Sequence, residues 1–152
     1  MERKAVFPGT FDPFTKGHES IVERSLGLVD HLYIAIGVND LKNSYFSLEK
    51  RLDMIRSLYA GNKKITVTSY EGLTVDFAKT TEARFIIRGV RSVNDFEYEK
   101  TIADTNKKIS GIDTIVFFTE PEFTHISSTI VRELLKFGHD VKDFIPDNMK
   151  IE

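Results

Sequence analysis

In this chain of 152 residues, the side chains best suited to take part in chemistry are one histidine and, far from it in the sequence, two arginines. His18 follows Gly17 at the end of "PGTFDPFTKGH", and Arg88 and Arg91 flank a glycine in "IIRGVR". Glycine exposes backbone N–H groups, and guanidinium groups match the geometry of phosphates. Free N–H groups in the first turn of a helix after Gly17 would also favour an anion. These residue types favour phosphate binding, and the alternative for His18 is an ordinary, partly exposed polar residue at the start of a helix.

Two other stretches add hydroxyl and carboxylate groups. "HISSTIVREL" has three consecutive hydroxyl side chains at the start of an expected helix, with Arg132 one turn later. Helix capping explains one or two of the hydroxyls, and a nucleotide cradle is the alternative. Glu99 in "DFEYEKTI" could accept hydrogen bonds from nucleotide hydroxyls or organise a cation. Surface ion pairs with Glu97 and Glu99 are the competing explanation for Arg88 and Arg91.

Five β-rich runs alternate with helical patterns along the whole chain. The apolar, β-branched or aromatic runs predict strands at Lys4–Phe7, His31–Gly37, Lys64–Ser69, Arg84–Arg88 and Asp113–Phe118. Apolar residues spaced by three and four predict a helix after each strand, with Ser47 as an N-cap and Gly138 just beyond the last helix. This repetition predicts an α/β fold, a doubly wound five-stranded parallel sheet, in a single domain over residues 1–152.

Such a sheet would bring the chemically interesting residues together. Ligands of doubly wound sheets bind beyond the carboxyl ends of the strands, where the strand order reverses. The candidates follow four of the five predicted strands: Thr10 and His18, Lys42, Arg88 and Arg91, and Ser127–Ser128–Thr129. With the order 3-2-1-4-5, the first and fourth strands are neighbours, so His18 would face both arginines. We therefore predict that several cations converge on one pocket, although Lys42 alone is explained as well by a solvated loop lysine.

Composition excludes several other classes of protein. Hydrophobic residues make up 41% and charged residues 29% of the chain, and the net charge of -2 argues against a surface devoted to nucleic acid. There are no cysteines, so disulfides and thiolate metal sites are excluded. No apolar run reaches membrane-spanning length, and the N-terminus has no apolar leader. We expect a cytoplasmic protein without nucleic-acid or membrane partners, and no group of residues has the spacing of metal ligands.

Three motifs together carry a resemblance to a known family. "PGTFDPFTKGH", "IRGVRSVNDFEYE" and "ISSTIVREL", in this order and over about residues 3–148, are similar to those of bacterial phosphopantetheine adenylyltransferases of the HxGH nucleotidyltransferase superfamily. The resemblance implies a Rossmann-like nucleotidyltransferase fold. It also implies transfer of the adenylyl group of ATP to 4′-phosphopantetheine, giving dephospho-CoA and pyrophosphate, with Mg²⁺ as the cofactor. A cytoplasmic homohexamer is implied as well.

The same resemblance implies roles for individual residues, with His18 stabilising the transition state. The implied ATP-binding residues are Thr10, Phe11, His18, Gly89, Val90, Arg91, Glu99, Phe123, Thr124, His125, Ile126, Ser127, Ser128 and Thr129. The implied phosphopantetheine-binding residues are Thr10, Lys42, Thr74 and Arg88. Thr74 stands where the family usually has a larger apolar residue, which predicts a more polar pantetheine pocket.

The implied reaction suits the residues that the chain offers. A phosphate oxygen is already anionic at neutral pH, so the nucleophile needs no general base, and no catalytic carboxylate pair is present. The reaction instead needs two repelling anions held in line, with charge neutralised at the reacting phosphate. His18, Lys42, Arg88 and Arg91 are expected to supply positive charge. Two alternatives stay open: another adenylyl or cytidylyl transferase, and a nucleotide sensor without turnover.

Overall fold

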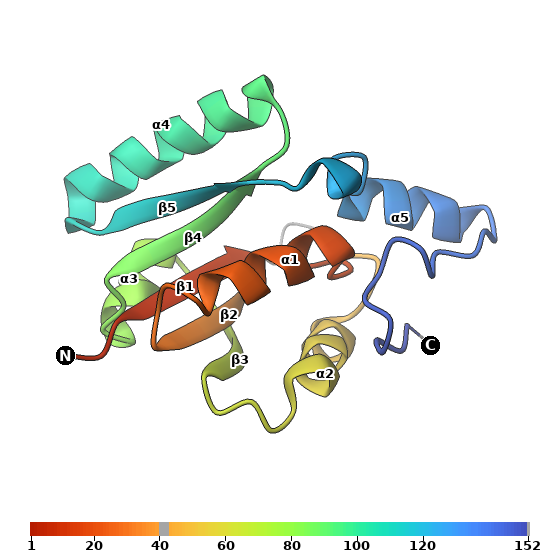
Figure 1. Ribbon diagram of the computed structural model, residues 1–152, viewed down its shortest axis with the longest axis horizontal. Coiled ribbons are helices and arrows are strands. Elements are labelled where there is room, and N and C mark those ends of the chain that lie inside the picture. Colours follow the sequence, from red (N-terminus) through yellow and green to blue (C-terminus); the bar gives the residue numbers. More distant parts are fainter. Residues whose placement is uncertain (40–42, 152) are drawn as a thin grey trace.

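The computed structural model describes residues 1–39 and 43–151, and its centre is a five-stranded parallel sheet. The strands are β1 (Lys4–Gly9), β2 (His31–Gly37), β3 (Ile65–Tyr70), β4 (Phe85–Val90) and β5 (Asp113–Phe118). Their order across the sheet is β3-β2-β1-β4-β5, and every neighbouring pair is parallel (Figure 1). The predicted fold class is therefore confirmed, the strand order is the one that the sequence analysis assumed, and the order reverses between β1 and β4.

The strand bounds agree with the prediction at β2 and β5 and differ at the other three strands. The strand β1 continues through Pro8 and Gly9 because these residues keep their register with Ala35 and Ile36 of β2. In the same way, β4 continues to Val90 beside β5. Arg88, the last residue of the predicted strand, consequently lies inside β4.

Each strand is followed by a helix, as predicted. The helices are α1 (Lys16–Ser25), α2 (Leu48–Tyr59), α3 (Thr74–Thr80), α4 (Val93–Ser110) and α5 (Ser128–Lys136), with a 3-10 turn, η1 (Pro121–Phe123), before α5. Ser47 caps α2 by accepting a hydrogen bond from the Lys50 N–H at 3.1 Å. Gly138, with φ of 73°, follows the C-cap of α5. No helix within the described ranges is long and apolar enough to cross a bilayer.

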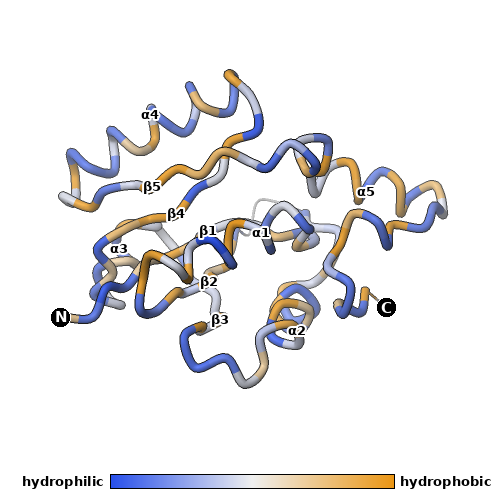
Figure 2. Tube along the Cα trace, viewed as in Figure 1, coloured by the Kyte–Doolittle hydropathy of each residue, from blue (hydrophilic) through white to orange (hydrophobic). Residues whose placement is uncertain are grey.

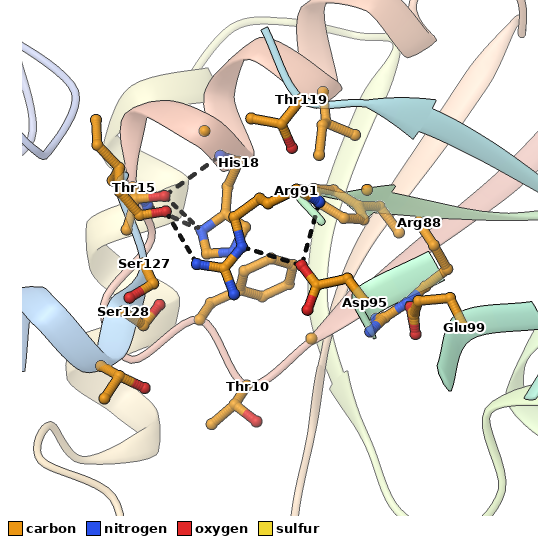
Figure 3. Close-up of a pocket in the computed structure, with 18 of the residues that line it drawn as sticks. Thr10, Thr15, His18, Arg88, Arg91, Asp95, Glu99, Thr119, Ser127 and Ser128 are labelled. Atoms are coloured by element: carbon orange, nitrogen blue, oxygen red, sulfur yellow. Dashed lines mark hydrogen bonds and ion pairs between the residues drawn. The ribbon is translucent and has the colours of Figure 1, made fainter. Parts of the chain in front are cut away.

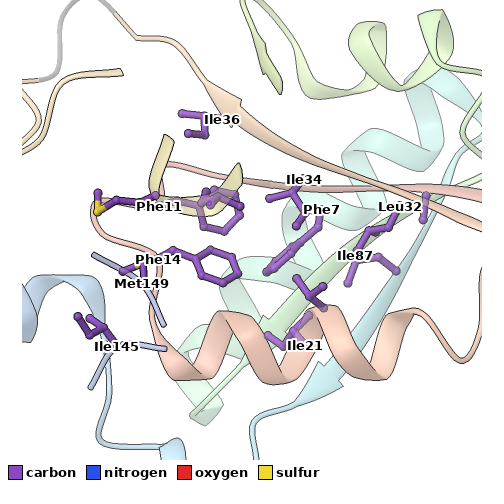
Figure 4. Packing of buried hydrophobic residues seen from close by; sticks show 14 of the residues in the cluster. Phe7, Phe11, Phe14, Ile21, Leu32, Ile34, Ile36, Ile87, Ile145 and Met149 are labelled. Carbon is purple, nitrogen blue, oxygen red and sulfur yellow. The ribbon is translucent and has the colours of Figure 1, made fainter. Parts of the chain in front are cut away.

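Apolar clusters cover both faces of the sheet because alternate strand residues point to opposite sides. In the larger cluster, side chains of α1, α2 and α5 pack with Phe7 and Ile87, and the rings of Phe11 and Phe14 lie between the sheet and α1 (Figure 4). In the smaller cluster, residues of α3 pack against Val6 of β1. Figure 2 shows apolar residues along the strands and alternating colours along the helices. This packing fixes the strand ends that carry the candidate site.

Candidate active site

The carboxyl ends of β1 and β4 open into a cavity of about 610 Å³, which also receives the start of α5. Sequence-predicted residues line it from four parts of the chain (Figure 3): Thr10, Phe11, His18, Arg88, Gly89, Arg91, Glu99, Ile126, Ser127, Ser128 and Thr129. The predicted convergence of these segments on one pocket is therefore confirmed. The binding role of each residue stays a prediction.

Other predicted residues lie elsewhere. Val90 is buried in β4. The segment Phe123–His125 begins at the end of the 3-10 turn and leads to Ile126. None of these residues lines the 610 Å³ cavity. Thr74, the first residue of α3, lines a neighbouring cavity instead. Lys42 lies outside the described residues.

The neighbouring cavity has a volume of about 300 Å³ and shares a wall with the first. Both cavities are lined by Pro8, Gly9, Thr10, Arg88 and Glu99. At its rim, the Thr74 hydroxyl and the Tyr70 hydroxyl form a hydrogen bond of 2.7 Å, so this side of the cavity is polar. Together, the two cavities form one site with room for two molecules in contact.

His18 is held in one orientation by the start of α1. Thr15 is the N-cap, and its hydroxyl accepts a hydrogen bond from the His18 N–H at 3.4 Å. In return, the Thr15 N–H donates to His18 Nδ1 at 3.0 Å. Because Nδ1 accepts this bond, we assign the ring proton to Nε2. The rings of Phe11 and Phe14 lie 4.9 and 5.3 Å from the imidazole, centroid to centroid.

This environment keeps His18 neutral. Burial, and then the positive charges of Arg88 and Arg91, lower the pKa of His18 to about 3. The expectation that His18 adds positive charge to the cleft is therefore wrong at neutral pH. The imidazole instead offers Nε2–H as a hydrogen-bond donor beside two permanently charged arginines.

Each arginine has a carboxylate partner. The Arg88 Nε donates to Glu99 Oε2 at 2.5 Å, and Arg88 Nη1 donates to the Pro8 carbonyl at 2.8 Å. The Arg91 Nε donates to Asp95 Oδ2 at 3.2 Å. Arg88 therefore pairs with Glu99, but this carboxylate is buried and not on the surface as the competing explanation requires, and Asp95 rather than Glu97 pairs with Arg91. These contacts use only part of the five N–H donors of each guanidinium.

Glu99 is nearly inaccessible, with 5% of its surface exposed. Its second carboxylate oxygen, Oε1, is buried and has no hydrogen-bond partner within the described chain. Asp95 and Glu99 both hold arginines, and no group of three or more histidine, aspartate or glutamate side chains among the described residues is arranged to bind a metal ion.

The three hydroxyls before and in α5 have different tasks. Ser127 is the N-cap and accepts from the Ile130 N–H at 3.2 Å, as the capping explanation predicts. Ser128 donates to the Pro13 carbonyl at 2.8 Å, which ties α5 to the loop after β1. All three residues, 127–129, still line the cavity, so the first-turn N–H groups of α5 lie at its wall.

Four residues that were not predicted also line the cavity: Thr15, Asp95, Tyr98 and Thr119. Capping patterns in the sequence could have indicated Thr15 and Asp95. Thr15 and His18, three residues apart, form a capping box with histidine in the usual place of glutamate or glutamine. Ser92 caps α4 by accepting from the Asp95 N–H at 3.1 Å, in the related Ser-x-x-Asp pattern.

Comparisons with known proteins agree with this architecture. Residues 6–134 match the sequence model of the Cytidylyltransferase-like family. Proteins named phosphopantetheine adenylyltransferase from Bacteroides thetaiotaomicron and Phocaeicola vulgatus are 60% and 57% identical, over 98% and 99% of this chain and 99% of each relative. A protein of the same name from Porphyromonas gingivalis is 49% identical over 97% of this chain and 97% of that relative.

Two solved structures share the fold. Both are of a bifunctional NMN adenylyltransferase/ADP ribose pyrophosphatase from Francisella tularensis, one of them complexed with AMP and a manganese ion. Their TM-scores are 0.69 and 0.72, at 19% and 20% sequence identity over 95% of this chain. The chain spans less than half of those longer chains, 44% and 45%. At this identity, the likeness supports the fold alone.

Proposed function

The chain belongs to the phosphopantetheine adenylyltransferases within the cytidylyltransferase-like family, and from this membership we propose how its two cavities work. The enzyme transfers the adenylyl group of ATP to 4′-phosphopantetheine, giving dephospho-CoA and pyrophosphate in coenzyme A synthesis. The observation that carries the mechanism is the shared wall: Thr10, Arg88 and Glu99 line both cavities. Two substrates bound side by side there would meet at these residues.

ATP occupies the 610 Å³ cavity, and phosphopantetheine occupies the 300 Å³ cavity. Support for this assignment comes from the lining: the start of α5, Arg91 and the His18 ring favour a polyphosphate in the first cavity. The second cavity has Arg88 at the shared wall for one phosphate and a mixed polar and apolar lining beyond it for the arm. Lys42 also binds this second phosphate in our proposal.

The reaction is a direct displacement. A phosphate oxygen of phosphopantetheine attacks the α-phosphorus of ATP and forms a new P–O bond, while the bond to the bridging oxygen breaks. Pyrophosphate leaves with that electron pair, so no covalent enzyme intermediate forms. Holding the two anions in line supplies much of the rate enhancement.

His18 donates its Nε2–H to an α-phosphate oxygen of ATP as charge grows there. The ring is already aligned by Thr15, so little reorganisation is needed in the transition state. Arg88 and Arg91 neutralise the phosphates from opposite ends of the Gly89–Val90 segment. Their ion pairs with Glu99 and Asp95 fix the two guanidinium planes.

Mg²⁺ enters as part of the substrate, bound to the phosphates of ATP. Asp95 and Glu99 each hold an arginine through one carboxylate oxygen, and Glu99 Oε1 has no hydrogen-bond partner within the described chain. Magnesium also favours phosphate oxygens and water over protein cages. No step of the mechanism requires a protein ligand to the ion.

The enzyme is a cytoplasmic homohexamer in this proposal, because its substrate ATP is a cytoplasmic metabolite and its surface offers an apolar contact area. Phe118 at the end of the edge strand β5 is 74% exposed, and Val93 and Tyr98 of α4 are 74% and 66% exposed. Large exposed apolar side chains on neighbouring elements mark protein contacts. Light scattering at two protein concentrations tests the assembly; a monomer at both would refute it.

Pyrophosphate release tests the activity against the two alternatives. The purified chain with Mg²⁺ and ATP should release pyrophosphate with phosphopantetheine and not with nicotinamide mononucleotide. The opposite preference identifies another nucleotidyltransferase, and no release with any acceptor identifies a nucleotide sensor. A thermal-shift series gives an independent measurement, because dephospho-CoA and coenzyme A should raise the melting temperature if they bind the folded site.

A further inference from the structure

Two buried charged residues beside the active site have no part in the mechanism described so far. Asp12 and Arg51 are 3% and 7% exposed, and neither lines either cavity. Burying charged groups is unfavourable unless their hydrogen-bonding capacity is satisfied. Their contacts explain how both are tolerated, and those contacts lead to the residues of the cleft.

Asp12 joins three segments of the chain. Its Oδ2 accepts from the Tyr45 N–H at 2.7 Å, and its Oδ1 accepts from the Phe46 N–H at 2.9 Å. Its carbonyl oxygen accepts from Arg132 Nη1 of α5 at 2.8 Å. The loop after β1 is thereby tied to the segment before α2 and to α5.

Arg51 of α2 also forms hydrogen bonds with the loop after β1. Its Nη1 donates to the Thr10 carbonyl at 2.9 Å, and its Nε donates to the Phe46 carbonyl at 3.1 Å. Its Nη2 donates to the Ser44 hydroxyl at 3.3 Å. Burial lowers the pKa of Arg51, and the negative charge of Asp12 opposes this shift. The guanidinium therefore remains charged and bonded to main-chain oxygens.

Between these two anchored positions lies Phe11, whose backbone is in the left-handed region with φ of 49°. For a bulky residue this conformation is unfavourable, and it persists only where the surroundings hold it. The bonds to Thr10 on one side and to Asp12 on the other hold it here. The conformation places the Phe11 ring edge-on to the His18 ring, at 4.9 Å and 88°.

We propose that Asp12 and Arg51 are positioning residues that hold the His18 ring for catalysis, acting through the left-handed backbone and the ring of Phe11. The kinetic part of this inference rests on the proposed function. The capping bonds from Thr15 fix His18 Nδ1 from the helix side, and the Phe11 ring fixes the imidazole plane from the loop side. Both restraints are needed to aim Nε2–H at a phosphate oxygen.

A double-mutant cycle between Asp12 and His18 tests this coupling. Asp12→Asn keeps the side-chain shape but can no longer accept from both the Tyr45 and Phe46 N–H groups. A misplacement of about 1 Å at a reacting group can cost about 100-fold in rate, so we expect kcat to fall by roughly 10- to 100-fold. In the His18→Ala background, the same substitution should lower kcat by less than about 3-fold. Equal losses in both backgrounds overturn the proposal.

Matched controls separate positioning from stability. Asp30 also accepts a hydrogen bond from a backbone N–H, that of Arg3 at 2.7 Å, but it lies at the amino ends of β1 and β2, away from the cavity. Asp30→Asn should lower the melting temperature without changing kcat. If Asp12→Asn behaves in the same way, its role is structural and the proposal is wrong. If Asp12→Asn does not fold, Arg51→Lys enters the same cycle, with Arg56→Lys as its control, because the exposed Arg56 also donates to a carbonyl.

A spectroscopic measurement keeps the inference independent of the substrate. The imidazole ¹⁵N signals of His18 should shift in Asp12→Asn, or in Arg51→Lys, and stay unchanged in Asp30→Asn. Unchanged His18 signals in the Asp12 or Arg51 variant overturn the positioning role even if the unmodified enzyme is fully active. Conversely, an unmodified chain that ignores phosphopantetheine overturns the proposed function alone, and the ¹⁵N comparison still decides the positioning role.

Discussion

The neutral state of His18 makes protein stability depend on pH in a predictable direction. Its pKa is about 3 in the folded chain, against an ordinary value of 6.5 in the unfolded chain. Between these values, the unfolded state binds a proton and the folded state does not, so acid favours unfolding. The contribution of His18 is therefore fully present above pH 6.5 and is lost progressively as the pH falls toward 3.

The expected magnitude at pH 5 follows from these two values. There the unfolded histidine is almost fully protonated and the folded one almost fully neutral, which corresponds to about 2 kcal/mol of unfolding free energy relative to pH 8. His18→Gln removes the titration and keeps the capping box, because glutamine at this position also reaches the Thr15 N–H.

Urea denaturation at pH 8 and pH 5 measures this contribution. We expect the unmodified chain to lose about 2 kcal/mol more than His18→Gln over this interval, since all other titrating groups are common to both chains. Identical losses in the two chains would show that His18 titrates normally in the folded state. His18 would then not be a permanently neutral donor in the cleft.

Three substitutions test other parts of the site. Gly9→Ala would place a Cβ 2.8 Å from Cζ of the Phe11 ring, so we expect kcat to fall by at least 10-fold with a smaller change in the KM for ATP, measured by steady-state kinetics. Arg88→Gln leaves the Glu99 carboxylate buried without its cation, and chemical denaturation should show a loss of up to roughly 3 kcal/mol, limited because Arg88 itself is 34% exposed. Thr74→Val removes the hydrogen bond to the neighbouring tyrosine hydroxyl at the rim of the smaller cavity, and initial-rate measurements should show a higher KM for phosphopantetheine with the KM for ATP unchanged.

Much of the fold could be predicted from the sequence because apolar periodicity depends on local residue order. The prediction failed at strand ends, and the reason is the same in β1 and β4. Pro8, Gly9 and Gly89 have low strand propensity, so the local pattern ends before them. Register with the neighbouring strands extends both strands nevertheless, since Pro8 pairs with Ala35 and Gly89 with Phe117. Pairing across the sheet is a tertiary effect that a local pattern does not contain.

The candidate site could be predicted at the level of which segments meet, because parallel strands bring their carboxyl ends to one edge. The charge state of His18 and the contacts of Asp12 and Arg51 could not be predicted from the sequence. The charge of His18 depends on burial against rings and on two arginines, one inside β4 and one just after it. The roles of Asp12 and Arg51 depend on hydrogen bonds to main-chain groups, which have no sequence signature.

A neutral histidine beside two arginines allows binding and transition-state stabilisation to be performed by different residues. Arg88 and Arg91 hold charges that do not titrate near neutral pH, so their attraction for the two anionic substrates of the proposed reaction does not change with their own ionisation over the physiological range. Those same charges, together with burial, keep the imidazole neutral. His18 can therefore donate one directed hydrogen bond to charge that develops in the transition state, without adding a fixed attraction for the bound substrates. In the proposed mechanism, the arginines therefore contribute mainly to binding, whereas the orientation of the imidazole contributes mainly to the rate.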